Sequence, residues 1–316
     1  MSAGNVTDWP PSESVTAAPV RSRLSLLFAV VAGSMVVFVG NYIFFVRTTV
    51  GQELDNAALV GAEHETQGVI TEAWDLLDII SVASLALACV VIGMVALLRK
   101  RVALAFAALT TIAVANVATQ LLKRAILERP DLIGAGDVNS LPSGHATVAT
   151  TVAVGLVMVT APRWRLAVAL VTVVFPIGAA VAVVTASWHR PSDSIASFCV
   201  VLGVAAASLA AVVAVFGFDA GERPPRWVRR SGLAFASAAI VILSAVSLLG
   251  LWAVRNRLQD GPLDARWETV AYTASTAGIV AGALAVMLCL VLALRGVAVG
   301  HGGWNRTADG AMAVDR

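Results

Sequence analysis

Residues 76–122 read LLDIISVASLALACVVIGMVALL, then RKR, then VALAFAALTTIAVANVATQLL, and this stretch decides the fold. Each apolar run is long enough for a helix that crosses the hydrocarbon core of a bilayer, which needs about 20 residues. Only Arg99, Lys100 and Arg101 separate the two runs, so the chain has to turn back at once. The stretch therefore predicts a helical hairpin across a membrane.

The composition of the whole chain agrees with a membrane protein. Of its 316 residues 58% are hydrophobic and 13% are charged, whereas a soluble domain has about 25% charged residues. The net charge of +2 provides no basic field that would favour nucleic acid. The three cysteines lie within apolar runs and lack the spacing of metal ligands, so we expect neither a disulfide framework nor a metal site. The composition excludes a soluble globule and indicates an integral membrane protein.

The same length criterion predicts an all-α, polytopic bundle of about eight transmembrane helices. They cover residues 24–46, 76–98, 102–122, 145–161, 166–186, 194–216, 231–254 and 269–294. Basic residues gather at 99–101 and 223–230, which the positive-inside rule places in the cytoplasm. We therefore expect a multi-pass protein of the cell membrane, with both termini cytoplasmic and with residues 123–144 and 187–193 outside.

This topology divides the chain into four parts. Residues 1–23 and 295–316 are predicted to be cytoplasmic tails. Residues 24–216 form a six-helix core that contains both outer segments with reactive side chains, and residues 217–294 add two further helices. We expect the chemistry to lie in the core, and nothing in the sequence specifies an oligomeric state.

One outer segment, Pro142-Ser143-Gly144-His145, stands immediately before an apolar helix. The free N–H groups and the dipole of a helix N-terminus favour an anion, and Gly144 lets it approach the backbone closely. Four cations can add positive charge at the same point: Lys123, Arg124, Arg129 and Arg190. A phosphoryl group in transfer spreads negative charge over its equatorial oxygens, so this arrangement would stabilise it.

The other outer segment contains His189 and, four residues later, Asp193. A carboxylate at this spacing can fix the tautomer of the imidazole and raise its basicity, as a nucleophilic histidine requires. His145 is then free to protonate a leaving oxygen. The plainer alternative is a loop turn at residues 142–144 and two histidines that cap helices at the membrane interface.

Together these segments resemble the signature of the type 2 phosphatidic acid phosphatase (PAP2) superfamily, in its bacterial form. The signature consists of Lys-x6-Arg-Pro, Pro-Ser-Gly-His and Ser-Arg-x5-His-x3-Asp. Residues 142–145 match the second motif completely, and His189 and Asp193 match the end of the third. The resemblance covers the first six predicted helices, and the order and spacing of the motifs make it specific.

The resemblance implies an integral-membrane phosphatase that acts on a lipid phosphate (phosphatidate-like, or a polyprenyl phosphate or diphosphate) at the extracytoplasmic face. It implies that no metal or cofactor takes part. It makes His189 the nucleophile that forms a phosphohistidine, Asp193 the residue that orients it, and His145 the general acid. Phosphate binding is implied for Ser143, Gly144, Lys123 and Arg129.

The chain departs from the family pattern at two places. Five residues rather than six separate Lys123 from Arg129, which turns Lys123 by about 100° around a helix. Val183 stands where the pattern has a phosphate-binding arginine, so Arg190 or Arg124 would have to supply that charge. Beside a phosphatase, two alternatives stand: a phosphotransferase that uses an alcohol acceptor, and a catalytically impaired homologue that binds or transports lipid.

Overall fold

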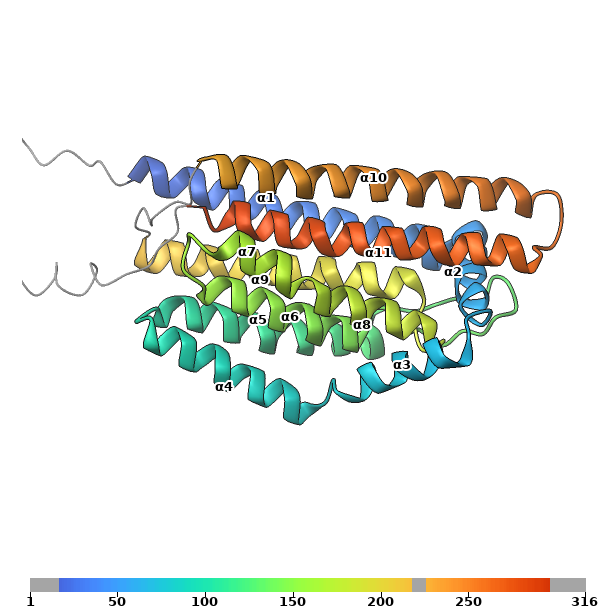
Figure 1. The fold of residues 1–316 in the computed structure, drawn as a ribbon, viewed down its shortest axis with the longest axis horizontal. Helices are drawn as coiled ribbons and strands as arrows, with labels where there is room; N and C mark the ends of the chain where they lie inside the picture. Colours follow the sequence, from blue (N-terminus) through green and yellow to red (C-terminus); the bar gives the residue numbers. More distant parts are fainter. Residues whose placement is uncertain (1–16, 218–225, 296–316) are drawn as a thin grey trace, which may run out of the picture.

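The computed structural model describes residues 17–217 and 226–295, which form helices and no strand. Most helices run side by side in an elongated bundle (Figure 1). Their bounds are α1 Ala17–Asn41, α2 Thr49–Ala62, α3 Gln67–Asp78, α4 Val82–Leu98, α5 Val102–Leu121, α6 Gly144–Val159, α7 Arg165–Thr172, α8 Val174–Thr185, α9 Pro191–Phe216, α10 Arg226–Leu258 and α11 Ala265–Ala293. Two π-helical turns, η1 Tyr42–Val46 and η2 Leu122–Ile126, extend α1 and α5. Most of the predicted tails, and part of the basic segment 223–230, lie outside the described residues.

The predicted multi-pass helical architecture is confirmed. Within the described residues, six helical spans are long and apolar enough to cross a membrane. The helices α3 and α4 meet the same criterion as a pair, although the chain bends by 58° between them. The apolar helix α6 is shorter, at 16 residues. The count of eight membrane crossings and the division into four parts remain predictions.

The bend between α3 and α4 differs from the single straight helix predicted over 76–98. Ser81 is the N-cap of α4, and its Oγ accepts a hydrogen bond from Ser84 N at 3.2 Å. In return, Ser81 N donates to Ser84 Oγ at 2.9 Å. These serine side chains offer the backbone partners outside the helical ladder, so one helix can end here and another can begin.

The second difference is α2, which lies in a segment that the sequence placed in an outer loop. Thr48 begins the helix, because its Oγ1 accepts a hydrogen bond from Gly51 N at 3.0 Å. The buried face of α2 packs with α10 and α11 in a small apolar cluster. At Gly61 the two backbones approach so closely that a Cβ atom would lie 2.1 Å from the carbonyl oxygen of Glu268. The helix is therefore fixed against α11.

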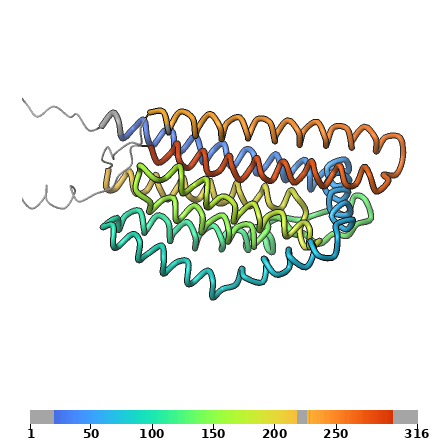
Figure 2. The backbone as a smooth tube through the Cα atoms, viewed as in Figure 1, coloured from blue at the N-terminus to red at the C-terminus, as the bar shows by residue number. Residues whose placement is uncertain are grey.

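The two ends of the bundle carry different parts of the chain. The α4–α5 hairpin, the start of α1 and the end of α11 lie at one end, as the backbone trace in Figure 2 shows. The helix α2 and the loop between α5 and α6 lie at the other end. Many contacts in the central core involve alanine, including the fully buried Ala108, Ala153 and Ala180. Small side chains let helices approach closely, and these three lie on α5, α6 and α8.

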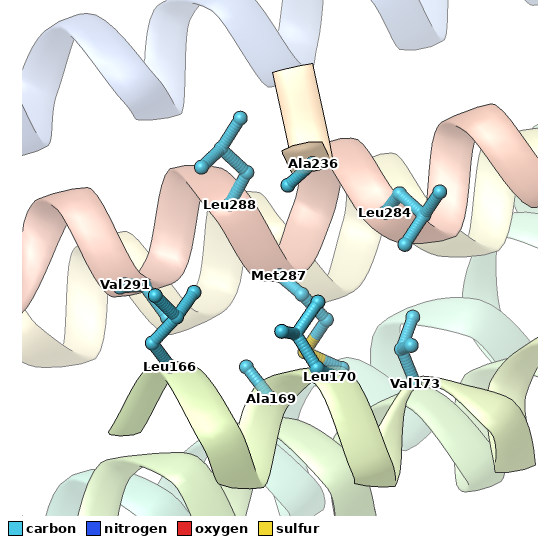
Figure 3. Close-up of a pocket in the computed structure, with 9 residues that line it drawn as sticks. All are labelled: Leu166, Ala169, Leu170, Val173, Ala236, Leu284, Met287, Leu288 and Val291. Carbon is cyan, nitrogen blue, oxygen red and sulfur yellow. The ribbon is translucent and has the colours of Figure 1, made fainter. Parts of the chain in front are cut away.

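A pocket between α7, α10 and α11 is lined by apolar side chains alone (Figure 3). Its lining residues are Leu166, Ala169, Leu170, Val173, Ala236, Leu284, Met287, Leu288 and Val291. None of them belongs to a predicted motif. The pocket therefore offers apolar packing surface and no group for acid–base or phosphoryl chemistry.

Candidate active site

The imidazole of His189 and the carboxylate of Asp193 form a buried pair at the start of α9. The distance from His189 Nδ1 to Asp193 Oδ2 is 2.9 Å, and the residues are 7% and 0% exposed. The same carboxylate oxygen accepts a hydrogen bond from Arg190 N at 3.0 Å. Since a carboxylate accepts hydrogen bonds, His189 carries its proton on Nδ1 and presents the lone pair of Nε2. This is the state that a nucleophilic histidine requires.

The N-terminus of α6 is joined directly to this pair. Ser143 N donates to the backbone oxygen of Asp193 at 3.1 Å, so the two helix starts are in contact. Ser143 is the N-cap of α6, with its Oγ near Ala146 N at 3.4 Å, and it is fully buried. Around Gly144, a Cβ atom would have only Gln120 Nε2 within 4 Å, at 3.4 Å. The backbone at Gly144 is therefore open to an anion.

The imidazole of His145 lies beside the same helix start. It is half-buried, and its ring centroid is 5.5 Å from that of Trp188 at an interplanar angle of 49°. It is close enough to His189 and Lys123 for their charges to act on it. The two imidazoles thus belong to one electrostatic site.

Two arginines bring unpaired donors to this site. Arg129 is 4% exposed, and its Nε and Nη2 atoms are buried without a hydrogen-bond partner among the residues that the structure describes. Nε of the half-buried Arg190 is buried without a partner as well. Burial, and next the nearby charge of Arg190, lower the pKa of the Arg129 guanidinium. Buried donors of this kind normally have partners, so an oxyanion bound between the guanidiniums would satisfy them.

The two remaining cations of the predicted set occupy different surroundings. Both Lys123 and Arg124 lie on the π-helical turn η2. Lys123 is half-buried and close enough to Asp193 for their charges to interact. Arg124 is exposed. The structure therefore brings Lys123 to the site and leaves Arg124 on the surface.

Side-chain amides hold the loop between α5 and α6. Nδ2 of Asn139 donates to three backbone oxygens of this loop at 3.0 to 3.2 Å. Gln52 on α2 donates from Nε2 to Pro130 O at 2.7 Å and to Val46 O at 2.8 Å. Together the two contacts connect the Arg129-Pro130 segment to the end of η1 through Gln52. The position of the Arg129 backbone therefore depends on α2.

Sequence reasoning missed the contribution of α2 and of the end of α1. Asp55, which lies between the first two helices predicted from the sequence, is 1% exposed and hydrogen-bonded to Ser192. Burial, followed by the charge of Asp193, raises the pKa of Asp55 to about 7. The signal was present as the polar pair Gln52 and Asp55, three residues apart and so on one face of a helix.

The residues that the structure describes contain no group of side chains that could bind a metal ion. Over 17–217 and 226–295, no group of three or more His, Cys, Asp or Glu side chains is arranged to hold a metal ion. The expectation of a metal-independent reaction stays a prediction.

Comparison with known proteins adds one finding. A family model described as the PAP2 superfamily matches residues 29–217. This match contains all three motif segments and ends directly after α9, so α10 and α11 lie outside it. No curated protein and no solved structure matches the chain.

Proposed function

Since this chain belongs to the PAP2 superfamily, a family of phosphatases, we propose that it hydrolyses a lipid phosphate at the extracytoplasmic end of its membrane helix bundle. The observation that carries this proposal is the buried His189–Asp193 pair beside arginine donors that have no partner in the described part of the chain. The pair supplies a nucleophile in the required tautomer. The donors of Arg129 and Arg190 supply the positive field for a phosphoryl group.

The first step transfers the phosphoryl group to the protein. His189 Nε2 attacks phosphorus while the bond from phosphorus to the lipid alcohol oxygen breaks. His145 donates a proton to that leaving oxygen, so the products are a neutral alcohol and a phosphohistidine. Lys123 and the open N-terminus at Gly144 stabilise the charge that develops on the equatorial oxygens.

The second step returns the protein to its starting state. A water molecule attacks phosphorus and gives a proton to His145, which the first step left deprotonated. The bond from phosphorus to His189 Nε2 breaks, and inorganic phosphate leaves. Throughout, Asp193 holds the Nδ1 proton and stabilises the positive charge on the imidazole.

Arg190 replaces the arginine that the family pattern has at Val183. Val183 is fully buried in the apolar core, so no cation reaches the site from that position. Arg190 has an unpaired Nε and a charge that acts on Arg129. Arg124 is exposed and is the weaker candidate.

Phosphate release from a panel of lipid phosphates tests the activity. The purified protein, in detergent micelles that contain a chelator, should release phosphate from at least one of phosphatidate, a polyprenyl phosphate and a polyprenyl diphosphate. Release without divalent metal would support the metal-free mechanism. A phosphorylated alcohol in place of free phosphate, when an alcohol acceptor is added, would show a phosphotransferase instead.

Variants of the two histidines test the mechanism. His189→Ala should abolish turnover and the acid-labile phosphoenzyme, since no other imidazole is held by a carboxylate at the site. His145→Ala should slow release from phosphatidate by about 10²-fold or more but affect an activated aryl phosphate much less, because a good leaving group needs little protonation. Arg255→Ala, at an exposed residue of α10 outside the family match, is the control. A labelled phosphohistidine in His189→Ala would contradict the assignment.

A further inference from the structure

The N-cap residue of α9 has no acceptor for the helix, although Asp193 in the first turn accepts a hydrogen bond from Arg190 N. Its N-cap residue is Arg190 and its first residue is Pro191. A helix N-terminus leaves backbone N–H groups unsatisfied, and a Ser, Thr, Asp or Asn at the N-cap normally accepts from one of them. Arginine has no acceptor in its side chain, so Arg190 cannot do this. The acceptor comes from another helix: Ser192 N donates to Asp55 Oδ1 at 3.1 Å.

Asp55 and Asn41 hold all the polar groups of Ser192. Ser192 Oγ donates to Asp55 Oδ2, and Asn41 Nδ2 donates to Ser192 O at 3.0 Å. Asp55 is 1% exposed, Asn41 is 8% exposed and Ser192 is 2% exposed, so water hardly competes for these hydrogen bonds. The first turn of α9 is thus fixed by α1 and α2.

This turn carries the groups that the reaction depends on. Ser192 directly precedes Asp193, whose side chain holds His189 and whose backbone oxygen accepts from Ser143 N. A shift of Ser192 would therefore move both the nucleophile and its contact with α6. Displacements of about 1 Å at such groups can cost on the order of 10²-fold in rate.

We propose that Asp55 is a positioning residue, a helix cap supplied from α2 that fixes the start of α9 and thereby the His189–Asp193 pair. The inference rests on the proposed function, which gives this pair its role. It also explains why the N-cap residue of α9 can be an arginine. Arg190 is at the N-cap, where its side chain reaches Arg129 and the site, and a capping side chain at that position would remove this cation.

Four variants on α2 test the proposal through the hydrolysis of phosphatidate in mixed micelles. Asp55→Ala should lower kcat by roughly 30- to 100-fold. KM should change less than about threefold, because the cations that bind the phosphate stay in place. Asp55→Asn keeps an oxygen for the Ser192 N–H and a donor for its hydroxyl, so kcat should stay within about threefold of the wild-type value. Glu53→Ala, at a neighbouring acid on the same helix, is the matched control.

Asp55→Glu separates position from charge. It keeps the carboxylate but moves it by about one bond length, so it should lower kcat by roughly tenfold or more. A fast Asp55→Glu together with a slow Asp55→Asn would show that charge matters rather than position, and would overturn the proposal. Wild-type kcat in Asp55→Ala would overturn it as well. The Asn and Glu variants decide the matter even where Asp55→Ala does not fold.

Imidazole ¹⁵N NMR separates a failure of this inference from a failure of the proposed function. If the wild-type protein hydrolyses no lipid phosphate, the proposed function is wrong, but the His189 resonances still report the geometry. In the wild type, Nδ1 and Nε2 should be well separated, because Asp193 fixes one tautomer. Asp55→Ala should bring the two shifts together, and Asp55→Asn should not. Unchanged resonances in Asp55→Ala would refute the positioning role.

Discussion

At the scale of single residues, the site holds charges of both signs in a space that largely excludes water. Asp193 is fully buried and Arg129 is 4% exposed, yet Nε and Nη2 of Arg129 have no hydrogen-bond partner among the described residues. Unpaired buried donors and acceptors are costly, and a protein that keeps them usually has a use for them. Here the donors are the part of the site that an oxyanion would complete.

The buried Nε of Arg190 and the exposure of Arg124 lead to opposite expectations for the two cations. Arg190→Ala should lower kcat by roughly 10²-fold, because in the proposed mechanism Arg190 contacts the transferring phosphoryl group. Arg124→Ala should change it less than about threefold, as expected for a solvated charge. Steady-state kinetics on phosphatidate measure both variants. Equal kcat in Arg190→Ala and the wild type would show that Lys123, Arg129 and the α6 N-terminus hold the phosphate alone.

The raised pKa of Asp55 predicts a pH dependence of stability. Burial and the facing charge of Asp193 raise this pKa from 3.8 to about 7, while the Ser192 bonds and the charge of Arg129 act against the rise. A raised pKa contributes stability that is complete below the unfolded pKa near 4 and is lost as the pH rises through about 7. The Tm of Asp55→Asn, relative to the wild type in the same detergent, should therefore increase from pH 5 to pH 8. A difference in Tm that stays constant over this range would contradict the prediction.

Much of the site's composition is readable from the sequence, but its geometry is not. The spacing of His189 and Asp193 predicts their contact, because residues four apart meet on a helix. The hydrogen bond from Ser192 to Asp55 joins residues 137 positions apart, and no local pattern encodes it. The orientation of Lys123 depends on the π-helical turn η2, which the motif spacing alone does not reveal.

At the scale of elements, α2 is the part of the fold that connects the site to the C-terminal helices. One end of it, through Gln52 and Asp55, contacts the two motif segments. Its other end crosses α11 at Gly61, next to the hydrogen-bonded pair of His64 Nε2 and Glu268 Oε2 at 2.7 Å. Sequence analysis did not reveal α2 because its acidic residues resemble those of a solvated loop. In the structure, however, buried and half-buried residues alternate along this helix.

Substitution of Gly61 tests the connection between α2 and α11. In Gly61→Ala the new Cβ would lie 2.1 Å from Glu268 O, so the helices have to move apart. Overpacking of this kind typically costs about 1–3 kcal/mol. We expect a lower Tm and a lower kcat, since α2 carries Asp55.

Gly68→Ala on α3 is the matched control for this substitution. Nothing lies within 4 Å of its added Cβ, so stability should not decrease. A Gly61→Ala protein with wild-type Tm and kcat would show that the α2–α11 crossing tolerates separation and does not constrain the site.

At the scale of the whole molecule, the hairpin at 99–101 and the motif segments lie at opposite ends of the bundle (Figure 2). Apolar runs and basic turns in the sequence predict this separation, because a helix that crosses the membrane carries the chain from one face to the other. The bend between α3 and α4 and the helix α2 are not predictable in the same way. They depend on serine side chains and tertiary packing rather than on hydropathy.

Cysteine labelling tests the orientation that charge predicts. Lys100→Cys and Asp137→Cys, both at exposed positions, should be labelled from opposite sides of intact cells once the native cysteines are replaced. A membrane-impermeant maleimide should reach Asp137→Cys from outside and Lys100→Cys only after permeabilisation. Labelling of both from outside would rule out the predicted topology, and the outward-facing site with it.

The packing of α2 on α11 implies an order in which the parts of the protein reach their final structure during synthesis. The three motif segments have been synthesised once the ribosome has passed Asp193. The apolar cluster that contains Ala58 of α2 also contains Ala271 of α11, so it can form only after the last helix has been made. Domains normally mature from the N-terminus as synthesis proceeds. Here the geometry around the nucleophile reaches its final form last, when α11 is inserted. A nascent or prematurely terminated chain would therefore carry every catalytic side chain without the support that aligns them.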